Sequence, residues 1–322
     1  MTEQKTAEGK LTPDDIATGS VVAALMNQNP FMSANDVLQR AFDAVTGLPR
    51  KELTFEALHW GTQFEVPIID EACKRLALSD YKTDFGRAFY HDDYPMAVSL
   101  DATAEGDGRE LVTDPDKGIY CANANRIFLK GKGIIEAKLT SHDAESELPP
   151  YRGKLQLQMA MDIMGCEWGA VAVLHKGIKL AIHVFKRDNT LINEIRDTAV
   201  DFKKRVDKYK EAEETDWYQF TSTRSAAAIF DEVNDSVLAI PALEDEVKAV
   251  DQMRQDIKLL EQRLEVTQAN IMGKMGAAKI LRAGKYSVTW PTINYKAVPE
   301  KIVPAKEART IRINKLRIKK DD

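Results

Sequence analysis

A short apolar run leads directly into two charged residues in the stretch GIIEAKLTS, residues 133–141. The run predicts a buried strand, and successive side chains of a strand alternate between its faces, so Glu136 and Lys138 project to the same side. On a protein surface such a pair contributes only about 0 to 1 kcal/mol. A second carboxylate, Asp101, ends the apolar run MAVSLD, which is predicted to deliver it to the rim of the same sheet.

Two carboxylates at one rim of a sheet provide the oxygen ligands that Mg²⁺ prefers, while the ion keeps waters and binds phosphate oxygens of a substrate. A lysine beside a metal-bound water helps to orient or deprotonate it and balances negative charge in the transition state. The side chains of Asp101, Glu136 and Lys138 therefore predict metal-dependent phosphoryl chemistry, with Mg²⁺ as the cofactor and Mn²⁺ able to replace it.

Helical and strand patterns alternate around these residues. A short helix is predicted in GSVVAALMNQ, and a second helix is capped by Ser33 with Asp36 three residues later. A third helix runs through FEALHWGTQFEVPIIDEACKRLAL, with a kink at Pro67. About five short strands follow, at MAVSL, RIFLKG, GIIEAKL, GAVAVL and KLAIHVF.

The loops between these strands predict part of the sheet topology. GKG at 131–133 and HKGIK at 175–179 are short enough to close hairpins. A helix in PPYRGKLQLQMAMDIMG separates the third and fourth strands, and an amphipathic helix follows the last one. Its expected buried stripe is Ile192, Ile195, Ala199, Phe202, Val206 and Tyr209. These elements predict an α/β fold with a mixed sheet of about five strands flanked by helices.

The chain divides into three predicted parts: a polar leader at 1–17, a catalytic domain at 18–215 and a C-terminal extension at 216–322. The extension contains a predicted helix of coiled-coil character at about 241–272, followed by short basic strand-like segments. Its apolar stripe consists of Leu243, Val247, Val250, Ile257, Leu260, Leu264 and Ile271.

Charge is distributed unevenly along the chain. The formal net charge is −5, but residues 273–322 contain thirteen Lys or Arg against four Asp or Glu, so this segment carries +9 and the rest carries −14. A basic tail of this kind is compatible with a polyanionic partner such as nucleic acid, or with a strand edge guarded by lysines. Arg312, Lys315 and Arg317 are the candidate DNA-backbone contacts in this tail.

Composition excludes several classes of protein. No signal peptide and no uninterrupted apolar run of about 18 residues is evident, so we expect a cytoplasmic location in a bacterial or phage-infected cell and no membrane partner. The three cysteines, Cys73, Cys121 and Cys166, are far apart and include no CxxC pair. They therefore indicate buried thiols and neither a disulfide framework nor a zinc site.

The order Asp, then Glu-x-Lys, at predicted strand ends resembles the restriction-endonuclease-like nuclease superfamily. Within it, the chain most resembles the YqaJ-like viral recombinase family, which includes lambda exonuclease. Three further stretches carry this narrower resemblance: GSVVAALMNQNPFMS, HWGTQFE and PPYRGKLQLQMAM. It covers roughly residues 18–210 and rests on the order of the motifs, since each motif alone is common.

The resemblance implies roles for individual residues. Glu65, Asp101 and Glu136 are expected to bind the metal, with the carbonyl of Ala137 as a further ligand. Lys138 is expected to act on the attacking water, which Gln156 helps to position, with Gln158 as the alternative glutamine. Gly61, on the same helix face as Glu65, leaves room for a DNA backbone.

The chain also departs from the family pattern. Ala102 follows Asp101 where glycine is usual, and the long separation from Glu136 leaves Asp114 and Asp116 as alternative ligands. Ser20 matches a serine of the family's 5′-phosphate pocket, although the arginine-rich segment that often precedes it is missing.

By resemblance, the chain is expected to degrade linear double-stranded DNA from its ends, in the 5′ to 3′ direction, during phage-type recombination. The implied assembly is a homo-oligomer, a trimer in the family, that cooperates with a single-strand annealing protein. Two alternatives remain open at this point: an endonuclease of restriction or repair type with the same site, and a non-catalytic DNA-binding or coiled-coil adaptor.

Overall fold

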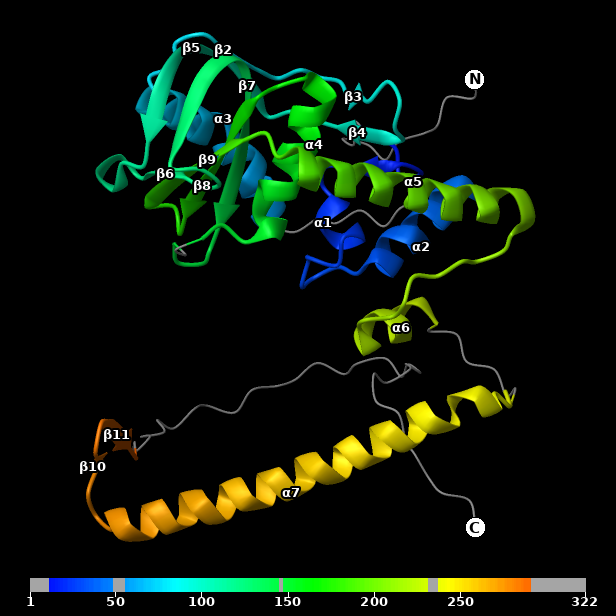
Figure 1. Cartoon of the computed structure of the whole chain (residues 1–322), viewed down its shortest axis with the longest axis vertical. Helices are drawn as coiled ribbons and strands as arrows, with labels where there is room; N and C mark the ends of the chain where they lie inside the picture. Colours follow the sequence, from blue (N-terminus) through cyan, green and yellow to red (C-terminus); the bar gives the residue numbers. More distant parts are fainter. Residues whose placement is uncertain (1–11, 49–55, 145–146, 231–236, 291–322) are drawn as a thin grey trace, which may run out of the picture. The chain divides into compact units, whose positions relative to one another are not determined.

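The computed structural model describes residues 12–48, 56–144, 147–230 and 237–290. The chain forms two compact units, Met1–Ile229 and Phe230–Asp322, and each is described here by itself (Figure 1). None of the helices in the described ranges combines the length and the apolar character that a membrane crossing needs.

A six-stranded mixed sheet forms the centre of the first unit, with the order β2-β5-β7-β8-β9-β6. The pairs β7–β8 and β6–β9 are parallel, and the other neighbours are antiparallel. The predicted mixed α/β fold is confirmed, with six strands where about five were expected. Their bounds are Tyr81–Thr83 (β2), Ala102–Val112 (β5), Ile119–Cys121 (β6), Arg126–Thr140 (β7), Trp168–His175 (β8) and Lys179–Lys186 (β9).

One predicted hairpin is wrong and the other is confirmed. RIFLKG and GIIEAKL do not fold back on each other at GKG; they form the single long strand β7. The reason is β5, which pairs with β7 from Ala102↔Ile135 to Val112↔Arg126 and satisfies its backbone groups along this length. The sequence of β5, ATAEGDGRELV, is polar and contains two glycines, so its strand pattern is weak. HKGIK does join the antiparallel strands β8 and β9.

The strand predicted at MAVSL lies outside the main sheet. It forms β4 (Met96–Val98), the middle strand of a small three-stranded sheet with β1 (Ala17–Thr18) and β3 (Phe89–Tyr90). All three residues of β4 are buried. Its apolar side chains therefore pack in the core of the first unit, but they do not lead Asp101 to the rim of the main sheet.

Helices cover both faces of the main sheet (Figure 1). The C-terminal half of α3 (Glu56–Arg75) buries Ile68, Ile69 and Ala72 against the face that carries Ile135. The helix runs continuously through Pro67. The opposite face carries Ile134 and is covered by α4 (Leu155–Met164) and α5 (Asn189–Ala212).

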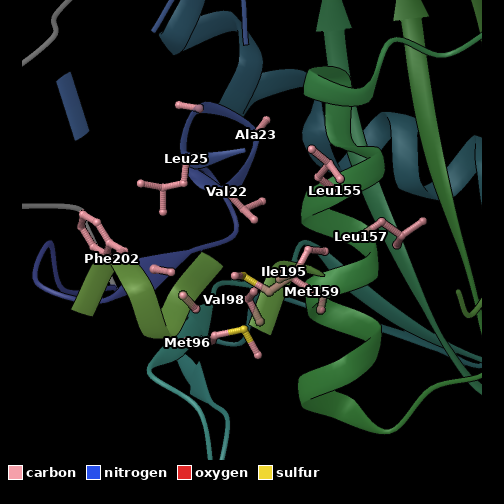
Figure 2. Packing of buried hydrophobic residues seen from close by; sticks show 14 of the residues in the cluster. Val22, Ala23, Leu25, Met96, Val98, Leu155, Leu157, Met159, Ile195 and Phe202 are labelled. Carbon is pink, nitrogen blue, oxygen red and sulfur yellow. The ribbon is translucent and has the colours of Figure 1, made fainter. Parts of the chain in front are cut away.

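The second layer of helices closes the core on the α4 side, as Figure 2 shows for its buried side chains. The short helix α1 (Val22–Leu25) packs against α2 (Ala34–Val45), α4 and α5, and α2 contacts α5 through the stacked rings of Phe42 and Tyr209. Ser33 and Asp36 form the predicted capping box of α2. Five of the six residues in the predicted stripe of α5 are buried, and Tyr209 is partly buried.

The chain after residue 215 continues to pack on the first unit. The side chain of Asn35 in α2 exchanges two hydrogen bonds with the backbone of Tyr218. Further along, α6 (Thr223–Ile229) places the Ser225 hydroxyl 2.8 Å from both the Ser33 hydroxyl and an Asp36 carboxylate oxygen. These contacts use the N-terminal cap of α2 twice, once for its own helix and once to hold α6.

The second unit contains the long helix α7 (Glu244–Met275) and the small antiparallel pair β10 (Ile280–Ala283) and β11 (Tyr286–Thr289). A turn of 3₁₀-helix, Pro241–Leu243, precedes α7. The predicted helix at about 241–272 is confirmed. The predicted basic strand-like segments are KYSVTW and TIRINKLRIKK; the first contains β11, and the second lies outside the described residues.

Candidate active site

The pairing of β5 with β7 brings Asp101 to Glu136. Ala102, the first residue of β5, is paired with Ile135, so the residue before it lies beside Glu136 at the end of the ladder. A carboxylate oxygen of Asp101 accepts a hydrogen bond from the backbone N–H of Ala137 at 2.8 Å. Asp101 thus reaches the predicted partner from the entry of β5, and not from the end of the MAVSL strand as expected. Asp101 and Glu136 are far apart in sequence because the chain between them runs out along β5 and returns along β7.

Glu136 and Lys138 share the face of β7 that α4 covers. The side chain of Glu136 is 1% exposed, and the Lys138 Nζ donates to its Oε1 at 2.5 Å. Lys138 also donates to the Oε1 of Gln156 on α4 at 3.3 Å. A strand and the first turn of a helix therefore hold the ammonium group between an acid and an amide.

Burial and charge set the protonation of this pair. Burial raises the pKa of Glu136 to about 8, and Asp101 adds to the increase by its like charge, while Lys138 opposes it. Burial also disfavours the charge on Lys138, but the carboxylates of Glu136 and Asp101 outweigh it and raise the pKa of the amine. Near neutral pH, Lys138 is therefore a cation that donates hydrogen bonds, whereas Glu136 is mostly protonated, because the cluster holds more acids than one ammonium can compensate.

Glu65 approaches the same cluster from α3. Burial raises the pKa of Glu65, as does the charge of Asp101, whereas Lys138 lowers it. One turn earlier, a Cβ added at Gly61 would meet no atom within 4 Å. The helix surface at Gly61, one turn before Glu65, is therefore open.

The donors at this site suit a hard divalent cation, because three acidic side chains whose like charges repel one another lie around a single amine. As the side chains stand, however, no three His, Cys, Asp or Glu residues within the described ranges are close enough together to hold an ion. Asp101 and Glu136 interact directly, through their charges and a side-chain hydrogen bond. Binding through all three carboxylates thus requires Glu65 or its neighbours to change rotamer.

The structure distinguishes between the two candidate glutamines. Gln158 is fully buried, donating to the carbonyl of Lys186 at 3.0 Å and accepting from the N–H of Asp188 at 2.9 Å. Both ends of its amide are occupied by backbone groups that join α4 to the start of α5. Gln156 is only partly buried and contacts Lys138, so the geometry favours it for a role in the site.

Two glycines that the sequence analysis missed shape the site. Gly153 has a φ of +107°, and a Cβ there would lie 3.0 Å from Val171 and 3.5 Å from the Cε of Lys138. The predicted helix at PPYRGK accordingly begins as a π-helical turn with non-helical Arg152 and Gly153, before α4 proper. A Cβ at Gly19 would lie 3.0 Å from the Cγ of Gln156. A glycine inside an otherwise helical pattern is the signal that could have pointed to Gly153.

Ser20 follows Gly19 directly and is exposed, with its hydroxyl 3.3 Å from that of Thr18. It lies in the turn that packs on Gln156, which places the predicted phosphate-binding serine next to the site. The other predicted DNA contacts, Arg312, Lys315 and Arg317, lie outside the described residues.

The alternative ligands have other partners. Asp114 caps a 3₁₀ turn (Pro115–Lys117) and forms an ion pair with Lys117 at 3.2 Å, which lowers the pKa of its carboxyl. Asp116 lies within this turn. Asp101 is the acid whose charge raises the pKa of both Glu65 and Glu136, so the geometry favours it over the alternatives.

Comparisons with known proteins add a structural likeness. The chain is similar to an alkaline exonuclease from Laribacter hongkongensis, with a TM-score of 0.43 and 15% identity over 61% of this chain and 90% of that one. It is similar to a phage-related exonuclease from Haemophilus somnus 129PT, with a TM-score of 0.43 and 11% identity over 62% and 96%. Both are exonucleases.

No family model matches the sequence, and no curated protein matches it. At these identities and TM-scores, only the geometry of the site itself supports a function.

Proposed function

We propose that the chain is a metal-dependent deoxyribonuclease that hydrolyses phosphodiester bonds of linear double-stranded DNA from an end, in the 5′ to 3′ direction. The observation that carries the proposal is the meeting of Asp101, Glu136 and Lys138 at the β5–β7 ladder, with Gln156 on the amine. Acids from distant parts of the chain around a single, partly buried amine suit the binding of a metal cation better than they suit a structural ion pair, because one ammonium cannot compensate all of them.

Each side chain has a distinct task in this proposal. Glu65, Asp101 and Glu136, with the carbonyl of Ala137, would hold Mg²⁺ or Mn²⁺, and the ion when bound would polarise the phosphoryl oxygen and acidify a water. Lys138 donates a hydrogen bond to the attacking water or to a phosphate oxygen, and its charge offsets the negative charge that develops there. Gln156 fixes the direction of the Lys138 amine.

The proposal assigns the DNA end to the surface around Ser20. Its exposed hydroxyl would donate to a terminal phosphate, while Arg312, Lys315 and Arg317 would contact the backbone further along. We assign the enzyme to phage-type recombination in the cytoplasm of a bacterial or phage-infected cell, where a homo-oligomer, a trimer by family resemblance, would supply 3′ single strands to an annealing protein.

Digestion of paired DNA substrates tests the proposal. The full chain is incubated with Mg²⁺ or Mn²⁺ and either a linear duplex labelled separately at each end or the same DNA as a closed circle. We expect mononucleotides from the 5′ ends of the linear DNA, an intact circle and complete inhibition by EDTA. Glu136→Gln keeps the shape of the side chain and is expected to remove the activity.

Each opposite result rejects a different part of the proposal. Nicking of the circle at the rate of linear digestion would reject the requirement for an end, and release from 3′ ends would reject the polarity. Full activity of Glu136→Gln would reject the assigned site. DNA binding without metal-dependent cleavage under any of these conditions would identify the chain as an adaptor.

A further inference from the structure

Helix α7 exposes a row of large apolar side chains. Ile257, Leu260 and Leu264 are each more than half exposed, so no described residue covers them. The helix has 32 residues and is about 48 Å long. Long helices in water are stabilised mainly by packing of an apolar face, so a row of this kind needs a partner surface.

The row follows a heptad repeat. Five apolar residues are spaced seven apart and occupy one position of the repeat, which we label a: Leu243, Val250, Ile257, Leu264 and Ile271. Three residues after two of them, Met253 and Leu260 occupy position d in the middle of the helix. From Val250 to Leu264 every a and d position is therefore apolar, which is the seam of a coiled coil.

We propose that α7 pairs with α7 of a second copy of this chain, in an antiparallel coiled coil centred between Lys258 and Leu259. In this register Ile257 packs on Leu260 of the second copy, and Met253 packs on its Leu264. The pairing is isologous, because each contact occurs twice about a twofold axis.

The charges beside the seam determine the direction. Arg254 and Glu261 flank it on one side, and Asp256 and Arg263 flank it on the other. In the antiparallel register Arg254 faces Glu261 of the second copy, and Asp256 faces its Arg263, so all four flanking pairs are attractive. A parallel pair would place Asp256 against Glu261 of the second copy, twice, and both are acids.

This arrangement rests on α7 alone and does not depend on the nuclease activity. It would link two nuclease units through their C-terminal helices, in addition to any assembly of the first units. The alternative is that residues 291–322 of the same chain, which the structure does not describe, cover the seam. In that case the protein would be a monomer.

Sedimentation of the full chain with charge variants tests both the partner and the direction. We expect the wild-type protein to associate through α7, and Glu261→Arg to weaken this association by about tenfold or more, because it places two arginines together on each side of the axis. The double variant Arg254→Glu/Glu261→Arg restores the attraction and should recover the association. Glu265→Arg, the same change on the outer face of the helix, is the matched control and should have no effect.

A distance measurement fixes the direction independently. A spin label at Asp245→Cys is introduced with Cys121→Ser, since Cys73 and Cys166 are buried. The two labels of an antiparallel pair should be about 40 Å apart, against about 10 Å in a parallel pair. A monomeric wild type, an unchanged or tighter association of Glu261→Arg, a double variant that stays dissociated, or the short label distance would each overturn the proposal.

Discussion

Leu157 on α4 is fully buried, whereas Leu260 on α7 is 62% exposed. The first unit surrounds its apolar side chains by layering helices on both faces of a sheet (Figure 1). The strands of this sheet also bring Asp101 and Glu136 together from distant parts of the chain. Helix α7 is built only from neighbours in sequence and leaves its apolar row uncovered. The comparison shows that packing in the first unit both stabilises the fold and positions the candidate active site, whereas α7 can bury its apolar row only against a partner.

The largest expected effect comes from the partly buried amine of Lys138 in the first unit. Lys138→Ala removes the group that faces Glu136 and Gln156, and we expect the rate of DNA digestion to fall by about a thousandfold. Lys258→Ala, on the outer face of α7, is the matched control and should retain full activity. Circular dichroism verifies that both variants are folded. Full activity of Lys138→Ala would contradict the catalytic role assigned to Lys138.

Truncation of matched leucines tests the difference in burial. Leu157→Ala leaves a cavity between α4 and the sheet, so the free energy of unfolding of the first unit should fall by about 3 kcal/mol. Leu260→Ala should leave that transition within about 0.5 kcal/mol and should weaken the self-association instead. Calorimetry of the full chain gives the first quantity and sedimentation gives the second. Equal destabilisation of the first unit by both changes would contradict the comparison.

The sequence predicts what depends on local pattern. The capping box at Ser33, the buried stripe of α5, the hairpin at HKGIK and the extent of α7 all follow from spacing within a few residues, and all are present. The strand that positions Asp101, β5, was not predicted. Its sequence is polar and contains glycines, and it is held in place by pairing with β7. Long-range pairing of this kind leaves little trace in local periodicity.

The site shows the same limit. The alternation of a strand sufficed to place Glu136 and Lys138 on one face, but it could not tell Gln156 from Gln158. That distinction depends on backbone groups of Lys186 and Asp188, which reach Gln158 from across the sheet and from the start of α5. Gly153 escaped notice because only its contact with Val171 and Lys138 reveals why a side chain is excluded there.

The two glutamines give the smallest and most selective prediction. Gln156→Ala should reduce turnover by about tenfold with little change in stability, because its amide orients Lys138 and is partly exposed. Gln158→Ala should instead lower the free energy of unfolding by about 2 kcal/mol, since it removes a fully buried side chain and leaves the backbone groups of Lys186 and Asp188 without this partner. Activity per folded molecule and chemical denaturation separate the two effects. The reverse assignment would show that Gln158 acts in the site.

The protonation of Glu136 should control metal binding. Its pKa of about 8 in the metal-free protein means that the carboxyl is mostly protonated below this pH, and a bound cation must displace that proton. The affinity for Mn²⁺ should therefore rise as the pH increases from about 6 to 8 and then level off. Burial disfavours the charged form of Glu136, and this form appears as the pH rises. Glu136 therefore contributes less to the stability of the metal-free fold at pH 8 than below pH 4.5.

Calorimetric titration of Mn²⁺ into the metal-free protein, without DNA, tests most directly whether distant acids share one cation. The wild-type protein should bind Mn²⁺, Asp101→Asn should weaken binding by about tenfold or more, and Asp114→Asn, at the alternative ligand, should bind as the wild type does. Unchanged affinity in Asp101→Asn, or a loss in Asp114→Asn instead, would contradict the site at the β5–β7 ladder.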